Sequence, residues 1–164
     1  MRKYSSLFHL ALHVSDMQRS IDYYTRVGAD FMFTLKLPDG RDWLTYMRIA
    51  KGQYLELFQI YEDHPMTPHG PINLAKNDVF GHLSFSVKDL KEAATEWAKN
   101  GIELIYAPFH PMDRPIPLDN FDARRSVDGC IIGWLVDPDG NKIEVMQQDD
   151  SMQQQFERAN PYED

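Results

Sequence analysis

The sequence predicts an α+β fold built from two tandem copies of one βαβββ module. The first observation is a repeat: residues 8–17 align without a gap on residues 81–90 and match a histidine, a leucine, a valine and an aspartate at the same spacing. The second is that an apolar segment near the end of each copy carries a single acid, Glu56 in the first and Glu144 in the second. The third is hydrophobic periodicity, which changes between the two-residue period of strands and the longer period of helices.

The first module is expected over residues 6–61. Its opening segment places His9, Ala11 and His13 on one face and apolar residues on the other, which is typical of a strand with one buried face. The predicted elements are a strand at 7–14, a helix from Met17 to about Val27 that Ser15 or Asp16 caps and Gly28 ends, and strands at 31–37, 43–49 and 53–60.

The second module is expected over residues 80–148, after a linker at 62–79 and before a C-terminal tail at 149–164. The histidines are 82 − 9 = 73 residues apart and the glutamates 144 − 56 = 88, so the second copy contains about 15 extra residues, which we place in the proline-rich stretch 107–129. The predicted elements are strands at 82–87, 102–107, 130–136 and 141–147, a helix at 90–99 followed by Gly101, and a further helix at 151–159.

Composition and charge exclude several classes of partner. The 164 residues carry a formal net charge of −8 with a sequence pI near 5.1, and the basic residues are scattered, which argues against binding to nucleic acid or an anionic membrane. The N-terminal residues lack the apolar run of a signal peptide, and no segment has the length of a membrane span. We therefore expect a soluble, cytoplasmic protein. The single cysteine, Cys130, is expected to be a buried small hydrophobic residue.

Two histidines and two glutamates occupy matching positions in the two copies: His9 and Glu56, then His82 and Glu144. Each glutamate has apolar neighbours that point to the opposite face, and burying a carboxylate costs free energy unless its charge is compensated. No arginine or lysine occupies a matching position in both copies. One divalent cation would compensate both carboxylates, and this set of nitrogen and oxygen ligands suits Ni, Co, Zn, Mn or Fe. The sequence predicts one metal site with open coordination positions, which favours catalysis.

Three further residues are candidates for contacts with a substrate: His13, Arg124 and Arg125. His13 shares a face with His9 and is expected to line the pocket or, less favourably, to replace it as a ligand, because the repeat aligns His13 with Ser86. Arg124 and Arg125 lie in the insertion, where they either bind a carboxylate or phosphate of the substrate or remain solvated. The other histidines are expected at the surface: His64, His69 and His110.

Three segments carry a family resemblance: HLALHVSDMQRSIDYY at 9–24, FGHLSFSV at 80–87 and DPDGNKIE at 137–144. They are similar to the opening histidine strand and helix, the second histidine strand and the closing hairpin of the vicinal oxygen chelate (VOC) superfamily, and within it of glyoxalase I (lactoylglutathione lyase). The resemblance spans residues 6–148 and implies that residues 1–164 form a single VOC domain.

The resemblance implies that the two modules are partly open cups that form a barrel-like cavity around the metal, within one chain or across a homodimer. The ligand set His9, Glu56, His82 and Glu144 is that of glyoxalase I. It implies a lyase or isomerase that acts through an enediolate on a small hydroxycarbonyl or thiohemiacetal substrate, with Glu144 or Glu56 moving the proton. The insertion and the long linker depart from glyoxalase I, and no residues match a glutathione site, so the substrate stays open.

Two other activities fit parts of the pattern. A ring-cleaving or other Fe(II) dioxygenase would keep His9 or His82 together with Glu144 and leave Glu56 without a role. A drug-binding or other ligand-binding protein, such as the bleomycin-resistance proteins that resemble this fold, would have no use for four buried ligand residues. The complete set in both copies therefore favours the metal-dependent enzyme.

Overall fold

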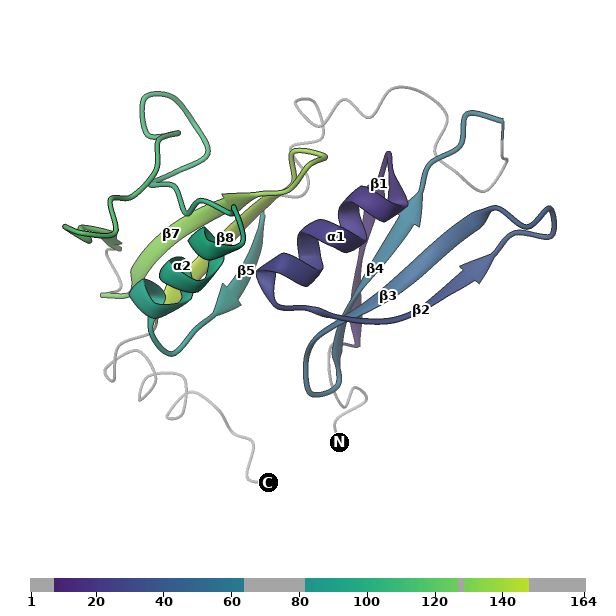
Figure 1. The fold of residues 1–164 in the computed structure, drawn as a ribbon, viewed down its shortest axis with the longest axis horizontal. Coiled ribbons are helices and arrows are strands. Elements are labelled where there is room, and N and C mark those ends of the chain that lie inside the picture. The colour runs from purple at the N-terminus through teal and green to yellow at the C-terminus, as the bar shows by residue number, and fades with distance from the viewer. Residues whose placement is uncertain (1–7, 64–81, 127–128, 148–164) are drawn as a thin grey trace, which may run out of the picture. The chain divides into compact units, whose positions relative to one another are not determined.

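The computed structural model describes residues 8–63, 82–126 and 129–147, and the chain divides into two compact units, Met1–Asn77 and Asp78–Asp164 (Figure 1). Most of the predicted linker at 62–79 and the whole predicted helix at 151–159 lie outside the described residues. Within the described residues, no helix is long and apolar enough to cross a membrane.

The first unit contains a four-stranded sheet and one helix. Its elements are β1 (His9–Val14), α1 (Met17–Val27), β2 (Asp30–Lys36), β3 (Asp42–Ala50) and β4 (Gln53–Gln59). The strand order is β1-β4-β3-β2, in which β1 runs parallel to β4 and the other neighbours are antiparallel. The chain therefore begins and ends the module on adjacent strands, as Figure 1 shows for β1 and β4.

The second unit repeats this topology. Its elements are β5 (Leu83–Ser86), α2 (Leu90–Lys99), β6 (Arg124–Arg125), β7 (Ile131–Val136) and β8 (Lys142–Gln147). The strand order is β5-β8-β7-β6, and β5 again runs parallel to the last strand, β8. The predicted α+β class with two βαβββ modules is confirmed.

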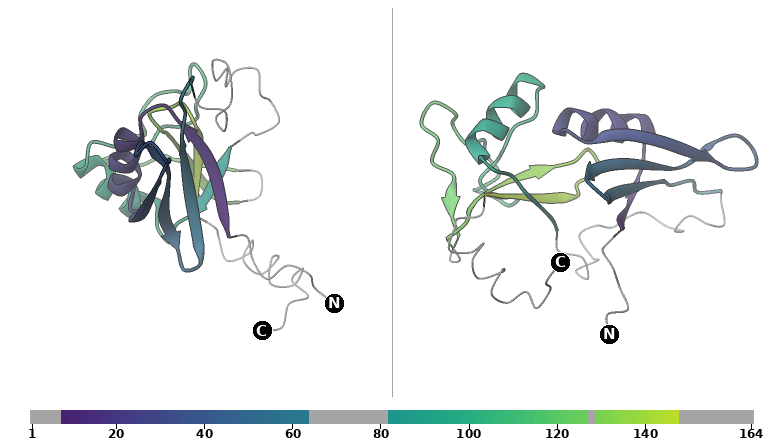
Figure 2. Two further views of the ribbon diagram at one scale, coloured as in Figure 1. Left: turned by 90° about the vertical axis from the view of Figure 1, so that its right-hand side faces the viewer. Right: turned by 90° about the horizontal axis from the view of Figure 1, so that it is seen from below.

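Alternation along the strands separates a buried face from a second face that carries the histidines. In β1, Leu12 and Val14 are buried while Ala11 and His13 are exposed. The buried face packs with Leu55 of β4, and α1 lies along this side of the sheet (Figure 2). The predicted division of the first strand into an apolar face and an imidazole face is therefore confirmed.

Both helices start and stop where the sequence predicts. The side chains of Asp16 and Asp89 accept hydrogen bonds from backbone amides three residues further on, at 2.9 and 2.8 Å, which caps α1 and α2. Helix α1 ends at Gly28, whose φ of 112° favours a residue without a Cβ atom. Gly101 follows α2 in the same left-handed region, at φ 71°.

A glutamine at the end of the last strand ties each helix to its sheet. The Gln59 side chain accepts a hydrogen bond from the Met17 amide at 2.7 Å, and the Gln147 side chain accepts one from the Leu90 amide at 2.8 Å. Gln59 also donates to the carbonyl of Ser15 at 2.9 Å. Each glutamine lies three residues after the glutamate of its module, so the last strand carries both the acid and the contact that positions the helix.

The predicted strand at 102–107 is wrong as a continuous element. Of these residues, only Ile105 pairs with β7, through an isolated bridge to Trp134. The chain then leaves the sheet, and it pairs with β7 again at β6. Residues 106–123 are thus an insertion within one strand, close to the stretch that the sequence predicts. Four prolines between 108 and 117 lack the amide that a strand ladder needs, which explains why the pairing stops.

The glutamine contact predicts a measurable cost of truncation. Gln59→Ala leaves the buried amide of Met17 without its acceptor, so the free energy of unfolding should fall by about 1–3 kcal/mol. Urea denaturation followed by circular dichroism measures this change. Gln53→Ala, at the exposed start of the same strand, is the matched control and should change stability by less than about 0.5 kcal/mol. Equal effects of the two variants would contradict the role of Gln59.

Candidate functional site

In the first unit, the parallel pairing of β1 with β4 brings His9 and Glu56 together. Ala11 lies directly opposite Glu56, and His9 lies two residues earlier on the same face of β1. His9 Nε2 is 3.6 Å from Glu56 Oε2. Glu56 is buried, with 7% of its surface exposed, whereas about a third of the His9 side chain is open to solvent.

The second unit builds the same pair with the same offset. Ser84 lies directly opposite Glu144 in the parallel pairing of β5 with β8, and His82 precedes Ser84 by two residues. His82 Nε2 is 3.5 Å from Glu144 Oε2. Two predicted ligands are therefore adjacent within each unit. Neither unit, in its described part, gathers three or more metal-ligand side chains by itself.

The separation of each pair suits a shared cation better than a hydrogen bond. An N–H···O hydrogen bond spans about 2.7–3.2 Å, so 3.6 Å between His9 and Glu56 is too long. Two ligands that each lie about 2.0–2.2 Å from one metal ion can be up to about 4.3 Å apart. The other ring nitrogen of His9, Nδ1, is buried and has no hydrogen-bond partner among the described residues. The imidazole is thus an unsatisfied polar group, which fits a residue that binds something else.

Tyr46 holds the carboxylate of Glu56 from the opposite side. It lies directly across from Glu56 on β3, and its hydroxyl donates a hydrogen bond to that carboxylate. This bond, together with burial of the ring, raises the pKa of Tyr46 to about 12. The raised pKa means that the surroundings of Tyr46 favour the protonated phenol, the form that can donate to Glu56.

Two aromatic rings lie close to the ring of His9. The centroid of the Phe8 ring lies 5.5 Å from that of His9, and the centroid of Tyr46 lies 5.7 Å away, both with the rings steeply inclined. Phe33 packs against Tyr46 at 5.2 Å and Tyr54 against Phe8 at 5.1 Å. The first half of the candidate site therefore has an aromatic wall.

The second half has the same ligands but different neighbours. The hydroxyl of Ser84 donates to Glu144 Oε2 at 3.1 Å. Trp134 occupies the position across from Glu144 on β7, and its ring lies 4.9 Å from that of His82 at a steep angle. Ser86, further along the same face of β5, is exposed. Small hydroxyl side chains thus occupy the positions that Ala11 and His13 have in the first unit.

Sequence reasoning missed Tyr46 and Trp134, although a signal was present. Each lies ten residues before the glutamate of its module, since 56 − 46 = 10 and 144 − 134 = 10. An aromatic residue at the same offset in both copies marks the position opposite the acid on the neighbouring antiparallel strand. Aromatic residues are common in strands, where they usually serve packing, so neither residue stands out by its type alone.

The residue pattern and the fold agree with the comparisons with known proteins. The sequence profile of the Glyoxalase/Bleomycin resistance protein/Dioxygenase superfamily matches residues 6–145, most of the chain. The chain belongs to this superfamily.

The similarity to known proteins covers most of the chain. The lactoylglutathione lyase of Escherichia coli O157:H7 is 26% identical over 156 residues, which cover 88% of this chain and 94% of that protein. A glyoxalase I of Leishmania major, described as trypanothione-dependent, has a TM-score of 0.59 at 22% identity, covering 95% of both chains. An antibiotic-binding protein from Streptomyces sp. CB03234 has a TM-score of 0.60 at 18% identity, covering 91% of this chain and all of that one. These two structures show a likeness of fold alone.

His13, the predicted substrate contact, lies on the same face of β1 as His9, four residues further along the strand. It is exposed, and its ring lies 6.3 Å from that of Phe58. The structure pairs Glu56 with His9, as the alignment of the two copies favours.

The structure places the two arginines on opposite faces of β6. Arg124 of β6 pairs with Ile132 of β7, and Ile132 pairs in turn with Met146 of β8. Met146 lies two residues after Glu144 on the same strand. Opposed residues of neighbouring strands share a face, so Arg124 is on the face of Glu144. Arg125 is on the other face, where its guanidinium donates to a backbone carbonyl of the turn before β7. Of the two arginines, only Arg124 therefore shares the face of Glu144.

The remaining sequence predictions on side chains can also be placed. Cys130 is fully buried, as predicted. His110 is exposed and lies 3.6 Å from Asp113, as expected for a surface residue. His64 and His69 lie outside the described residues.

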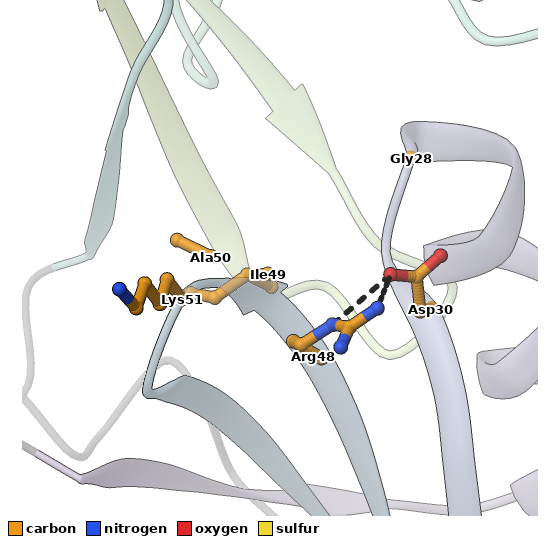
Figure 3. A pocket seen from close by; sticks show the side chains of 6 residues that line it. All are labelled: Gly28, Asp30, Arg48, Ile49, Ala50 and Lys51. Carbon is orange, nitrogen blue, oxygen red and sulfur yellow. Dashed lines mark hydrogen bonds and ion pairs between the residues drawn. The ribbon is translucent and has the colours of Figure 1, made fainter.

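The first unit also has a hollow of about 250 Å³ (Figure 3). It is lined by Gly28, Asp30, Arg48, Ile49, Ala50 and Lys51. Two nitrogens of the Arg48 guanidinium donate to Asp30 Oδ2, at 3.1 and 2.7 Å, so much of its charge is already compensated. None of the predicted ligands lines this hollow, and we assign it no role.

The bond between Tyr46 and Glu56 predicts a pH dependence at the alkaline end. A tyrosine of the unfolded chain titrates near pH 10, whereas the pKa of Tyr46 is about 12 in the fold. The bond therefore stabilises the fold fully below about pH 10 and is lost as the pH rises through about 12. Tyr46→Phe lacks this component, so the difference in free energy of unfolding between the wild type and the variant should shrink between about pH 9 and pH 11. A constant difference over this range would refute the assignment.

Proposed function

We propose that this superfamily member is a metal-dependent lyase or isomerase of the glyoxalase I type. The observation that carries the proposal is the duplicated pair of His9 with Glu56 and His82 with Glu144, at 3.6 and 3.5 Å. A structural role would need neither the equal offsets in both units nor a buried ring nitrogen of His9 without a hydrogen bond. The similarity to lactoylglutathione lyase over most of the chain supports the same reaction class.

The two pairs together supply the ligands for one divalent ion, taken from the two modules of one chain or of two chains in a homodimer. Two imidazole nitrogens and two carboxylate oxygens suit Ni, Co, Zn, Mn or Fe. When bound, the ion supplies positive charge that stabilises negative charge developing on adjacent oxygens of the substrate. The substrate class that fits is a small hydroxycarbonyl compound or thiohemiacetal.

One of the two glutamates moves a proton between neighbouring carbons of the substrate, and its surroundings favour Glu144. Glu144 is held by the hydroxyl of Ser84, whereas Glu56 is held by the phenol of Tyr46. The Glu144 side chain is also slightly more exposed, at 14% against 9% for Glu56. A carboxylate that is less firmly held is better able to leave one partner and accept a proton from another.

Arg124 is the candidate for recognition of an acidic group on the substrate. It shares a face with Glu144 and lies at the sheet edge, on the strand that returns from the insertion. A guanidinium binds a carboxylate or phosphate through paired hydrogen bonds. The substrate would therefore carry its reacting carbons at the histidines and its acidic group toward β6.

A metal-binding measurement tests the proposal directly. Wild-type protein without a metal-binding tag should take up about one divalent ion per site, as mass spectrometry and competition with a chromophoric chelator would show. His9→Ala, Glu56→Gln, His82→Ala and Glu144→Gln should each weaken binding by more than about tenfold. His13→Ala is the matched control because His13 shares strand and face with His9 but is not paired with Glu56. If the wild-type protein takes up no metal, the proposed metal-dependent activity is excluded and a ligand-binding protein is the remaining alternative.

The same preparation separates the enzymatic alternatives. The metal-loaded enzyme should convert the thiohemiacetal that glutathione forms with a 2-oxoaldehyde, or a small hydroxycarbonyl compound, without consuming oxygen. Glu144→Gln should reduce kcat by a factor of about 100 or more if it is the general base. Oxygen consumption that depends on iron and survives Glu56→Gln would instead indicate a dioxygenase.

The opposite faces of the two arginines predict opposite results on substitution. Arg124→Gln should raise KM for an acidic substrate about tenfold or more, because a hydrogen bond to a charged group contributes about 1.5–3 kcal/mol. Arg125→Gln is the matched control and should leave KM within about twofold, apart from any loss of stability measured separately. Steady-state kinetics on an acidic substrate and its neutral ester provides the comparison. Equal KM values for wild type and Arg124→Gln would contradict the role of Arg124.

A further inference from the structure

Tyr46, on β3, lies close to both candidate ligands of the first unit. It is directly across from Glu56 in the pairing of β3 with β4, and its hydroxyl donates to that carboxylate. Its ring also lies close to that of His9, with centroids 5.7 Å apart and planes inclined by 64°. One side chain therefore restrains both members of the pair.

Glu56 depends on a donor from β3 because its other neighbour offers none. Ala11, across from Glu56 on β1, has no polar side chain, and His9 Nε2 is too distant for a hydrogen bond. Glu56 is 7% exposed, so water has little access to its carboxylate. Among the described residues, Tyr46 is the side chain that donates to it.

We propose that Tyr46 is a positioning residue that fixes the carboxylate of Glu56 toward His9 and thereby sets the affinity of the first half-site for a divalent cation. This inference rests on the function proposed above. Groups that hydrogen bond to a ligand orient it and avoid the cost of ordering it when the ion binds, and their removal typically weakens metal binding about 10- to 100-fold.

The ring of Tyr46 is itself held in place, which a positioning role requires. Phe33 of the edge strand β2 packs against it at 5.2 Å, and Phe8 and Tyr54 approach it at 6.4 Å. These rings restrict the side-chain torsions of Tyr46, so its hydroxyl points at Glu56 before any ion binds.

In the second unit, the position equivalent to Tyr46 is occupied by Trp134, which has no phenol hydroxyl. Trp134 packs its ring against His82, but Glu144 takes its hydrogen bond from Ser84 on the other neighbouring strand. In both units an aromatic ring at this position contacts the histidine. Among the described residues, only in the first unit does the side chain at this position also donate a hydrogen bond to the glutamate.

The test compares metal affinities of single-atom variants. Tyr46→Phe removes the hydroxyl and keeps the ring against His9, and it should weaken binding of Co²⁺ and of Zn²⁺, measured by chelator competition, about tenfold or more. Tyr61→Phe is the matched control: it makes the same change in the same unit, at a hydroxyl that donates to the carbonyl of Asp42, and should alter the Kd by less than about twofold. Melting curves of the metal-free proteins check that both variants fold.

A double-mutant cycle decides whether Tyr46 acts through Glu56. In the Glu56→Gln background, Tyr46→Phe should change the Kd by no more than about twofold, because the carboxylate it orients is gone. Tyr46→Trp, which copies the arrangement at position 134, should weaken binding in the wild-type background even if Tyr46→Phe fails to fold. Wild-type affinity in Tyr46→Phe or Tyr46→Trp would overturn this inference and leave the proposed function intact. Absence of metal binding by the wild type would overturn both.

Discussion

The parallel pairing between the first and last strand of each module is the constraint on which the candidate site depends. Residues 9 and 56 are 47 positions apart in the chain, and residues 82 and 144 are 62 apart. Because paired strands share the alternation of their side chains, one register brings each histidine and each glutamate to the same face. A shift of one residue would turn the glutamate into the apolar face, so the buried leucines that fix the register also fix the pair.

Hydrogen bonds between the last strand and the helix of each module stabilise this strand pairing. The glutamine three residues after each glutamate binds the first turn of the helix, so the strand that carries the acid cannot move without the helix. The helix in turn covers the apolar face of the sheet. The two modules keep this frame in common, and they differ mainly in the side chains next to the ligands.

Much of the fold could be predicted from local signals, because those signals are strong here. Asp16 and Gly28 mark both ends of α1 physically, one by accepting an amide hydrogen bond and the other by adopting a positive φ. Strand ends were predicted to within two residues where periodicity is regular. The segment 102–107 failed because its apolar residues are buried without being paired as a strand, and burial alone gives the same pattern.

The candidate site was predictable only as far as the repeat reaches. Duplication picks out His9 and Glu56 with their counterparts, since a matched residue in both copies is rarely accidental. It cannot separate Arg124 from Arg125, because which face each occupies depends on the point at which the chain rejoins β7 after the insertion. Tyr46 and Trp134 share an offset but not a chemistry, so their roles emerge only when the strands are paired.

The like pairs of the two units lie among unlike neighbours. The rings of Phe8, Tyr46 and Tyr54 lie close to the first pair, whereas the hydroxyl of Ser84 and the ring of Trp134 lie beside the second. The same two ligand-type side chains are therefore held in two local environments of different polarity, and charge interactions are stronger where the surroundings are less polar. A duplicated chain can diversify in this way, through the residues around a pair that itself stays the same.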